Sequence, residues 1–203
     1  MTKKNTIGFA FIAAMLAFAS ASSANAGQAA MTLAGKTSQP IGHYEFCKTH
    51  AIECKPLERD FGPAKLTPEL WKTILDVNYT VNTTIRPETD LEQYGVEEFW
   101  AYPVTAGDCE DYALLKRREL MEKGVSASDL LITVVLQPNG EGHAVLTVRT
   151  DRGDFILDNM RNKVMLWSDT EYTYLKRQAG DNPGQWIKII DSRNSAMAAL
   201  QTK

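Results

Sequence analysis

The 203-residue sequence is poor in cysteine and histidine, with three of each, and neither charge sign is in large excess. The formal net charge is −3, so the chain lacks the basic surplus of nucleic-acid-binding domains, and we expect no nucleic-acid partner. It has no internal repeat and no low-complexity block, which excludes repeat arrays and fibrous folds. Apolar residues make up 44% of the chain, enough for the core of a single globular domain.

Long hydrophobic runs are also scarce, and the one candidate lies at the start of the chain. Two lysines precede an apolar run over residues 7–19, and Ala24-Asn25-Ala26 then matches a signal-peptidase site. The run is short for a membrane span and is soon followed by serines. We therefore expect residues 1–26 to be a cleaved secretory signal and the mature chain, 27–203, to be periplasmic or secreted. An uncleaved anchor is the alternative.

Export makes the three cysteines informative, because an oxidising compartment favours their pairing. Cys47 and Cys54 are separated by six residues, a short loop that a disulfide can close, which leaves Cys109 as the free thiol. The alternative is a metal site built from Cys47, Cys54, His43 and His50. No standard zinc spacing is matched, so we expect the disulfide.

Cys109 lies where a helix is expected to begin. Asp108 can cap the first turn, and residues 123–124, Lys-Gly, provide the stop. The free N–H groups and the positive dipole of a first turn favour a thiolate. Asp108, Glu110 and Asp111 oppose this effect, because like charge disfavours a thiolate. An imidazolium or a bound cation is needed to offset them.

The remaining periodicity places helices first and strands after. One helix is expected from Pro68 to just before Arg86-Pro87, and a shorter one over residues 44–54. After Gly124 the pattern becomes extended. The expected strands cover residues 130–136, 143–149, 155–158, 164–167 and 186–190. Helices followed by antiparallel strands predict an α+β fold.

Three segments show no sustained period. Residues 27–39 and 192–203 are small and polar, and we expect them to be flexible. Residues 88–104 are expected to be mostly irregular, and they carry Trp100 shortly before Cys109. Trp100 is a candidate wall of a substrate cleft, and the alternative is that it packs under the Cys109 helix.

His143 and Asp158 are candidates for the groups that thiol-based acyl transfer requires besides the thiolate, a base and a residue that orients it. His143 opens one expected strand and Asp158 ends the next. If Asp151-Arg152 form a two-residue hairpin turn, Asp158 lies on the same face as His143 and diagonal to it. A three-residue loop would put it on the opposite face. Taken singly, His143 is better explained as a hydrogen-bonded core residue and Asp158 as a turn cap. The joint occurrence of Cys109, His143 and Asp158 is what favours a catalytic site.

Three motifs resemble the signature blocks of the bacterial transglutaminase-like cysteine proteinases: residues 107–113 (GDCEDYA), 142–146 (GHAVL) and 157–159 (LDN). Further positions resemble the same family: Phe46-Cys47, Glu53-Cys54, Trp71, Val81-Asn82, Ile85, Trp100, Pro103 and Trp186. The resemblance implies a papain-like, transglutaminase-type core in which a nucleophile-bearing helix packs on an antiparallel sheet. It also implies Cys109 as nucleophile, His143 as base and acid, and Asp158 as the orienting carboxylate.

The resemblance also suggests a substrate and a cofactor. The family includes periplasmic proteases that cut large surface adhesins near paired alanines and so release biofilms. In those members acidic residues beside the cysteine bind calcium, and Asp108 and Glu110 occupy the matching positions. The expected partners are a protein substrate such as a surface adhesin and, as a further candidate, an inner-membrane regulator.

Three activities fit these residues. The first is an exported cysteine endopeptidase with a Cys-His-Asp triad. The second is a transglutaminase-type acyl transferase, which uses the same triad with an amine in place of water. The third is a non-catalytic module that binds calcium or a partner, against which the intact set of Cys109, His143 and Asp158 argues.

Overall fold

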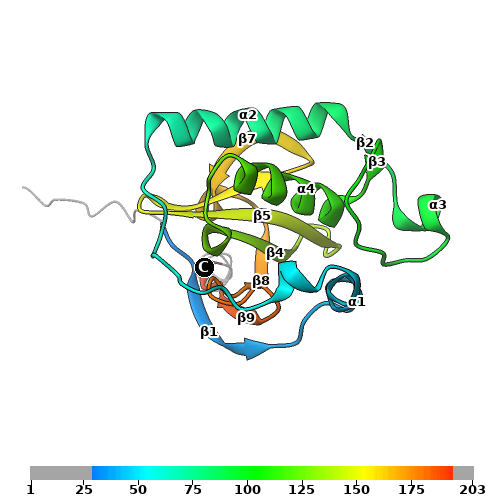
Figure 1. The fold of residues 1–203 in the computed structure, drawn as a ribbon, viewed down its shortest axis with the longest axis horizontal. Coiled ribbons are helices and arrows are strands. Elements are labelled where there is room, and N and C mark those ends of the chain that lie inside the picture. Colours follow the sequence, from blue (N-terminus) through cyan, green and yellow to red (C-terminus); the bar gives the residue numbers. More distant parts are fainter. Residues whose placement is uncertain (1–28, 194–203) are drawn as a thin grey trace, which may run out of the picture.

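The computed structural model describes residues 29–193 as an antiparallel sheet with helices packed on it (Figure 1). The sheet order is β1-β9-β8-β4-β5-β6-β7. Its strands are β1 (Thr32–Thr37), β4 (Leu130–Leu136), β5 (Gly142–Thr150), β6 (Gly153–Asp158), β7 (Arg161–Leu166), β8 (Thr173–Gln178) and β9 (Trp186–Ile190). A short parallel pair joins β2 (Arg86–Pro87) to β3 (Ala106–Gly107). The predicted α+β class is confirmed.

The helices precede most of the sheet in the chain. They are α1 (Ile41–Thr49), α2 (Pro68–Thr84), α3 (Asp90–Tyr94) and α4 (Cys109–Glu122), with 3-10 turns η1 (Ala51–Cys54), η2 (Ala127–Asp129) and η3 (Trp167–Asp169). Helix α4 lies across β4 and β5, and α2 packs beside it over β7 (Figure 1). Within residues 29–193 no helix is long and apolar enough to cross a membrane.

Strand β4 is buried on both faces, which explains its continuous apolar sequence. On one face Ile132 joins the core cluster under α4. On the other face Val135 joins a second cluster that contains Tyr172 and Trp167. Helix α4 therefore rests on a sheet whose opposite face is covered by a second apolar cluster.

The β5–β6 hairpin has the two-residue turn, the first of the two alternatives that the sequence left open. Leu146 pairs with Leu157 and Thr150 with Gly153, so the turn between the strands consists of residues 151–152. Gly153 has a φ of 125°, and a Cβ there would lie 2.5 Å from the carbonyl oxygen of Ala29. The turn thus requires glycine and fixes which residues of β6 face those of β5.

Two elements differ from the predictions. The prediction that residues 27–39 are flexible is wrong for residues 32–37, because these residues form β1 and pair with β9. Strand β8 was not anticipated, although it lies between β4 and β9. The expected secretory signal, the start at Gly27 and residues 194–203 lie outside the described residues.

The other boundaries differ less. The short helix expected over residues 44–54 is α1 followed by η1. The segment expected to be irregular, residues 88–104, contains α3, which begins with a capping box between Thr89 and Glu92. The helix from Pro68 is present as α2, capped by Thr67.

Candidate active site

The strongest contact in the candidate site joins His143 of β5 to Asp158 of β6. His143 Nε2 lies 2.9 Å from Asp158 Oδ1, and both residues are buried. This is the diagonal pairing that the two-residue turn predicts. With Nε2 engaged, Nδ1 is the ring nitrogen left to serve a thiol.

Asp158 has three further partners that the sequence did not indicate. Tyr172 donates its hydroxyl to Oδ2 at 2.6 Å, the N–H of Met160 donates to Oδ1 at 3.0 Å, and Arg161 Nε lies 3.1 Å from Oδ2. Burial alone would raise the pKa of Asp158. The hydrogen bonds from His143, Tyr172 and Met160 outweigh burial and hold that pKa below its usual value. Asp158 is thus kept as a carboxylate that can orient the ring.

Cys109 is the first residue of α4 and meets β5 directly. Its Sγ accepts a hydrogen bond of 3.3 Å from the N–H of Ala144, the residue after His143. Cys109, His143 and Trp100 line one cavity of about 250 Å³. Trp100 is also buried in the core cluster under α4, the alternative that the sequence left open. The thiol, the imidazole and an aromatic wall therefore share one opening.

The thiol itself is not activated in this arrangement. Burial, followed by the neighbouring Glu110 carboxyl, raises the pKa of Cys109 well above its usual value. The Cys109 thiol donates to Glu110 Oε2 at 3.1 Å. The acidic neighbours therefore act in the direction that the sequence raised as an objection, and burial adds to their effect. The expected cap also differs, since Asp108 makes no side-chain capping bond.

Asp108 and Glu110 are joined by a third acid, Asp90, which the sequence did not single out. Carboxylate oxygens of these three residues lie within 4.8 Å of one another. Burial raises the pKa of Asp90 and Asp108, and burial together with Asp108 raises that of Glu110 to about 9. Oδ1 of Asp90 and Oδ1 of Asp108 are buried without a hydrogen-bond partner within residues 29–193.

This cluster has the chemistry of a calcium site. Ca²⁺ takes several oxygen ligands, and a divalent cation would relieve the repulsion that raises these pKa values. Asp111, the fourth acid nearby, accepts a hydrogen bond from the N–H of Ala101 through Oδ1. The sequence signal that was available for Asp90 is the capping box at Thr89, which marks a helix start there.

The predicted disulfide between Cys47 and Cys54 is present. This disulfide rules out the alternative metal site at Cys47, Cys54, His43 and His50, because the two sulfur atoms are bonded to each other. His43 is buried, and its Nδ1 accepts from Trp186 Nε1 at 3.1 Å. Burial, with a smaller effect of nearby Arg117, lowers the pKa of His43 to about 4. His50 is stacked on Phe46.

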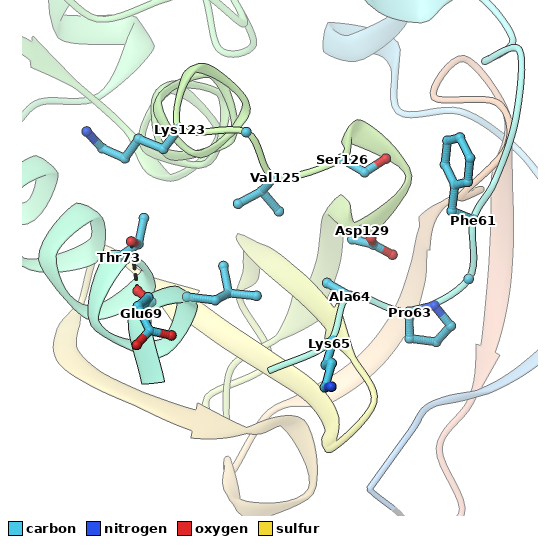
Figure 2. A pocket seen from close by; sticks show the side chains of 13 residues that line it. Phe61, Pro63, Ala64, Lys65, Glu69, Thr73, Lys123, Val125, Ser126 and Asp129 are labelled. Atoms are coloured by element: carbon cyan, nitrogen blue, oxygen red, sulfur yellow. Dashed lines mark hydrogen bonds between the residues drawn. The ribbon is translucent and has the colours of Figure 1, made fainter. Parts of the chain in front are cut away.

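A second hollow, of about 510 Å³, lies at the other end of α4 (Figure 2). Lys123, Val125 and Asp129 line one side, and Glu69 and Ala64 line the other. No cysteine or histidine lines it, so thiol chemistry belongs to the cavity at Cys109.

A helix-borne cysteine beside a His–Asp pair on an antiparallel sheet defines the papain-like, transglutaminase-type class of thiol enzymes. Residues 33–194 match the sequence profile of the family described as bacterial transglutaminase-like cysteine proteinase BTLCP, and the chain belongs to this family. It is accordingly a cysteine peptidase of the transglutaminase-like type. No curated protein sequence matches it.

Solved structures of LapG from Legionella pneumophila are similar to the chain. One has 26% identity and a TM-score of 0.50, covering 64% of this chain and 75% of LapG. An EGTA-treated form has 25% identity and a TM-score of 0.50, covering 64% and 71%. A calcium-bound form has 26% identity and a TM-score of 0.48, covering 56% of this chain and 66% of LapG, just under two thirds of that relative.

Proposed function

We propose that the protein is an exported cysteine endopeptidase that cleaves a protein substrate, with Cys109, His143 and Asp158 as its catalytic triad. The observation that carries the proposal is the His143–Asp158 contact, which lies one residue from the Ala144 N–H that holds the Cys109 sulfur. Nothing else along the described chain combines a free thiol, an imidazole and a carboxylate.

The reaction follows from these positions. The Cys109 sulfur attacks the carbonyl carbon of the scissile bond after its proton passes to His143 Nδ1. His143 then gives that proton to the leaving amine as the C–N bond breaks, which leaves a thioester. Water gives a proton to His143 while its oxygen attacks the thioester carbon. The C–S bond then breaks, the acid product leaves, and His143 returns that proton to the Cys109 sulfur. Asp158 holds the ring in the tautomer that each step needs.

Calcium is proposed as the cofactor, held by Asp108, Glu110 and Asp90. The support is the buried, mutually repelling oxygens of these residues, together with the EGTA-treated form among the related LapG structures. A bound cation would neutralise the acids that raise the pKa of Cys109. Glu110 would then accept the thiol proton less readily, leaving it for His143.

The substrate we propose is a large surface adhesin, as for the periplasmic members of the family, and an inner-membrane regulator is a proposed second partner. Export is supported by the signal-like residues 1–26 and by the Cys47–Cys54 disulfide, which is typical of oxidising compartments. An intact mass that begins at Gly27 is expected for the exported protein. A mass that includes residues 1–26 would instead indicate an anchor.

The test compares surface proteins of cells that lack the protein with cells that carry wild type or Cys109→Ala. We expect a surface protein to stay uncleaved in the deletion and in Cys109→Ala cells, and purified wild-type protein to cut it. Products formed with an added amine separate hydrolysis from transfer. Identical surface proteomes in all three strains, together with no cleavage in vitro, would refute the peptidase proposal.

A further inference from the structure

Two asparagines of α2 bind the turn that follows Asp158. Asn78 and Asn82 are four residues apart, so they lie on the same face of the helix, and α2 packs on β7 and β6 (Figure 1). Asparagine is a weak helix former, because its side chain competes for backbone groups. Two of them on the packed face of one helix therefore need an explanation beyond helix formation.

Asn82 binds both ends of the turn between β6 and β7. Its Nδ2 donates to the backbone carbonyl of Asp158 at 2.8 Å and to that of Arg161 at 3.2 Å, and lies 3.1 Å from Oδ1 of Asn162. Backbone carbonyl oxygens only accept, so the nitrogen end of the amide must face the turn. Oδ1 of Asn82 has no hydrogen-bond partner within residues 29–193. The side chain therefore acts on this turn through its two N–H groups.

Strand pairing sets the register of the hairpin but is weakest at Asp158. The pairing of β5 with β6 extends to Leu146 opposite Leu157, one residue before Asp158. The pairing of β6 with β7 shifts register between Ile156 and Asp158. Such a shift marks an irregularity at which the hydrogen-bond ladder is disrupted. A hydrogen bond from outside the sheet therefore has most effect on the backbone at this residue.

The turn that Asn82 binds also carries two partners of the Asp158 carboxylate. The N–H of Met160 donates to Oδ1 at 3.0 Å, and Nε of Arg161 lies 3.1 Å from Oδ2. The Arg161 carbonyl is itself one of the two that Asn82 binds. One amide thus holds the backbone of Asp158 together with the residues that surround its carboxylate.

We propose that Asn82 is a positioning residue for the reaction proposed above, and that its amide keeps Asp158 Oδ1 aligned with His143 Nε2. The inference rests on the proposed roles of Cys109, His143 and Asp158. Asn82 does not line the cavity at Cys109, and it acts through the carbonyl of Asp158. A catalytic group displaced by about 1 Å can cost about 10²-fold in rate, so a smaller shift is enough to be measured.

Asn78 is the matched control for this role. It is fully buried, and its Nδ2 donates to the carbonyls of Arg161 at 3.3 Å and Asn162 at 3.1 Å. It therefore binds the same turn from the same helix face, but neither carbonyl belongs to Asp158. A loss of packing between α2 and the turn should affect an Asn78 variant at least as strongly as an Asn82 variant.

The first experiment measures kinetics on the surface protein that the deletion strain leaves uncleaved. For Asn82→Ala we expect a kcat about 10-fold lower and an unchanged KM. Asn82→Asp, which keeps the shape of the side chain and removes both N–H donors, should do the same. Asn78→Ala should lower the melting temperature and keep the wild-type kcat.

The second experiment needs no substrate. The Asp158 carboxylate only accepts, so His143 Nε2 carries the proton of their 2.9 Å bond. In a Cys109→Ala background this buried N–H should give a downfield proton NMR resonance, assigned by its loss in His143→Ala. Asn82→Ala should shift that resonance upfield, because the bond weakens, whereas Asn78→Ala should leave it in place.

The contrary outcomes are equally defined. If Asn82→Ala keeps the wild-type kcat and the wild-type resonance, or fails to fold where Asn78→Ala folds, the positioning role is overturned. Equal losses of kcat and equal shifts in both variants would also overturn it and assign the effect to packing of α2. If the wild-type protein cleaves no substrate, the proposed function fails by itself, and the resonance still decides whether Asn82 holds Asp158 against His143.

Discussion

His143 and Asp158 meet at 2.9 Å across two strands because a turn of two residues sets their register. The same turn requires Gly153, whose backbone conformation a residue with a side chain rarely adopts. The backbone pairing of β5 with β6 therefore does more to set the position of His143 against Asp158 than the two side chains do.

The triad is tested by three substitutions. Cys109→Ala should abolish peptide cleavage without unfolding the domain, since it removes little packing. His143→Ala and Asp158→Asn should each lower kcat by about 10³-fold or more. Cleavage assays with melting curves check this, and Cys109→Ala protein that still cuts substrate would contradict it.

Tyr172→Phe should weaken the site through Asp158. The lost hydrogen bond to a charged group is expected to cost about 2 kcal/mol of stability at pH 7 and to reduce kcat. The pKa of Asp158 is lowered on folding, so the stability it contributes is present above its ordinary value of 3.8 and is lost as pH falls through the folded value. The difference from wild type should thus shrink towards pH 3. A constant difference from pH 7 to pH 3 would exclude the hydrogen bond as its cause.

Calcium removal should reduce both turnover and melting temperature. Asp90→Asn should mimic the chelator, because Asp90 supplies one of the three clustered carboxylates. Glu97→Gln is the matched control, since Glu97 is an exposed acid outside the cluster. Wild-type activity and melting temperature in excess chelator would remove calcium from the mechanism.

His43 should make the protein acid-sensitive. Burial lowers the pKa of His43 from 6.5 to about 4, so the unfolded chain takes up a proton in this window before the folded one does. Stability should fall by up to about 3 kcal/mol as pH drops from 6.5 to 4. Denaturant melts at several pH values should show a flatter pH dependence of stability for His43→Gln than for wild type, and an equally steep dependence would exclude His43 as the cause.

The Cys47–Cys54 disulfide should contribute about 2 kcal/mol, at the low end of the usual range, because it closes a short loop. Replacing both cysteines by serine should lower the melting temperature and leave Cys109 able to cleave substrate. Peptide mapping of non-reduced protein checks the bond itself. Free thiols at both positions would show that the protein does not form it.

What the sequence predicted well depends on local information. Residues 130–136 carry a continuous apolar run, so β4 could be anticipated. The turn near Asp151-Arg152 could also be placed, but its length, and with it the β5–β6 register, was decided only by the structure. The pairing of Cys47 with Cys54 follows from spacing and compartment.

What the sequence did not predict depends on distant contacts. Strand β1 is mostly exposed and has no apolar alternation, and it is a strand only because β9 pairs with it. Tyr172 reaches Asp158 from outside the hairpin, and Asp90 reaches Glu110 from α3, twenty residues earlier in the sequence. The hydrophobic periodicity of a single sequence does not indicate contacts between residues that lie far apart in the chain.

The pairing of β1 with β9 also affects the order in which the strands of the sheet can form during folding. The first strand of the described chain, Thr32–Thr37, finds its partner only at Trp186–Ile190, about 150 residues later. Such a long-range contact forms late, because the intervening chain must be ordered before the two strands meet. The segment Thr32–Thr37 therefore has no strand partner until Trp186–Ile190 is in place, and this edge of the sheet is completed only when nearly all of the described chain is ordered.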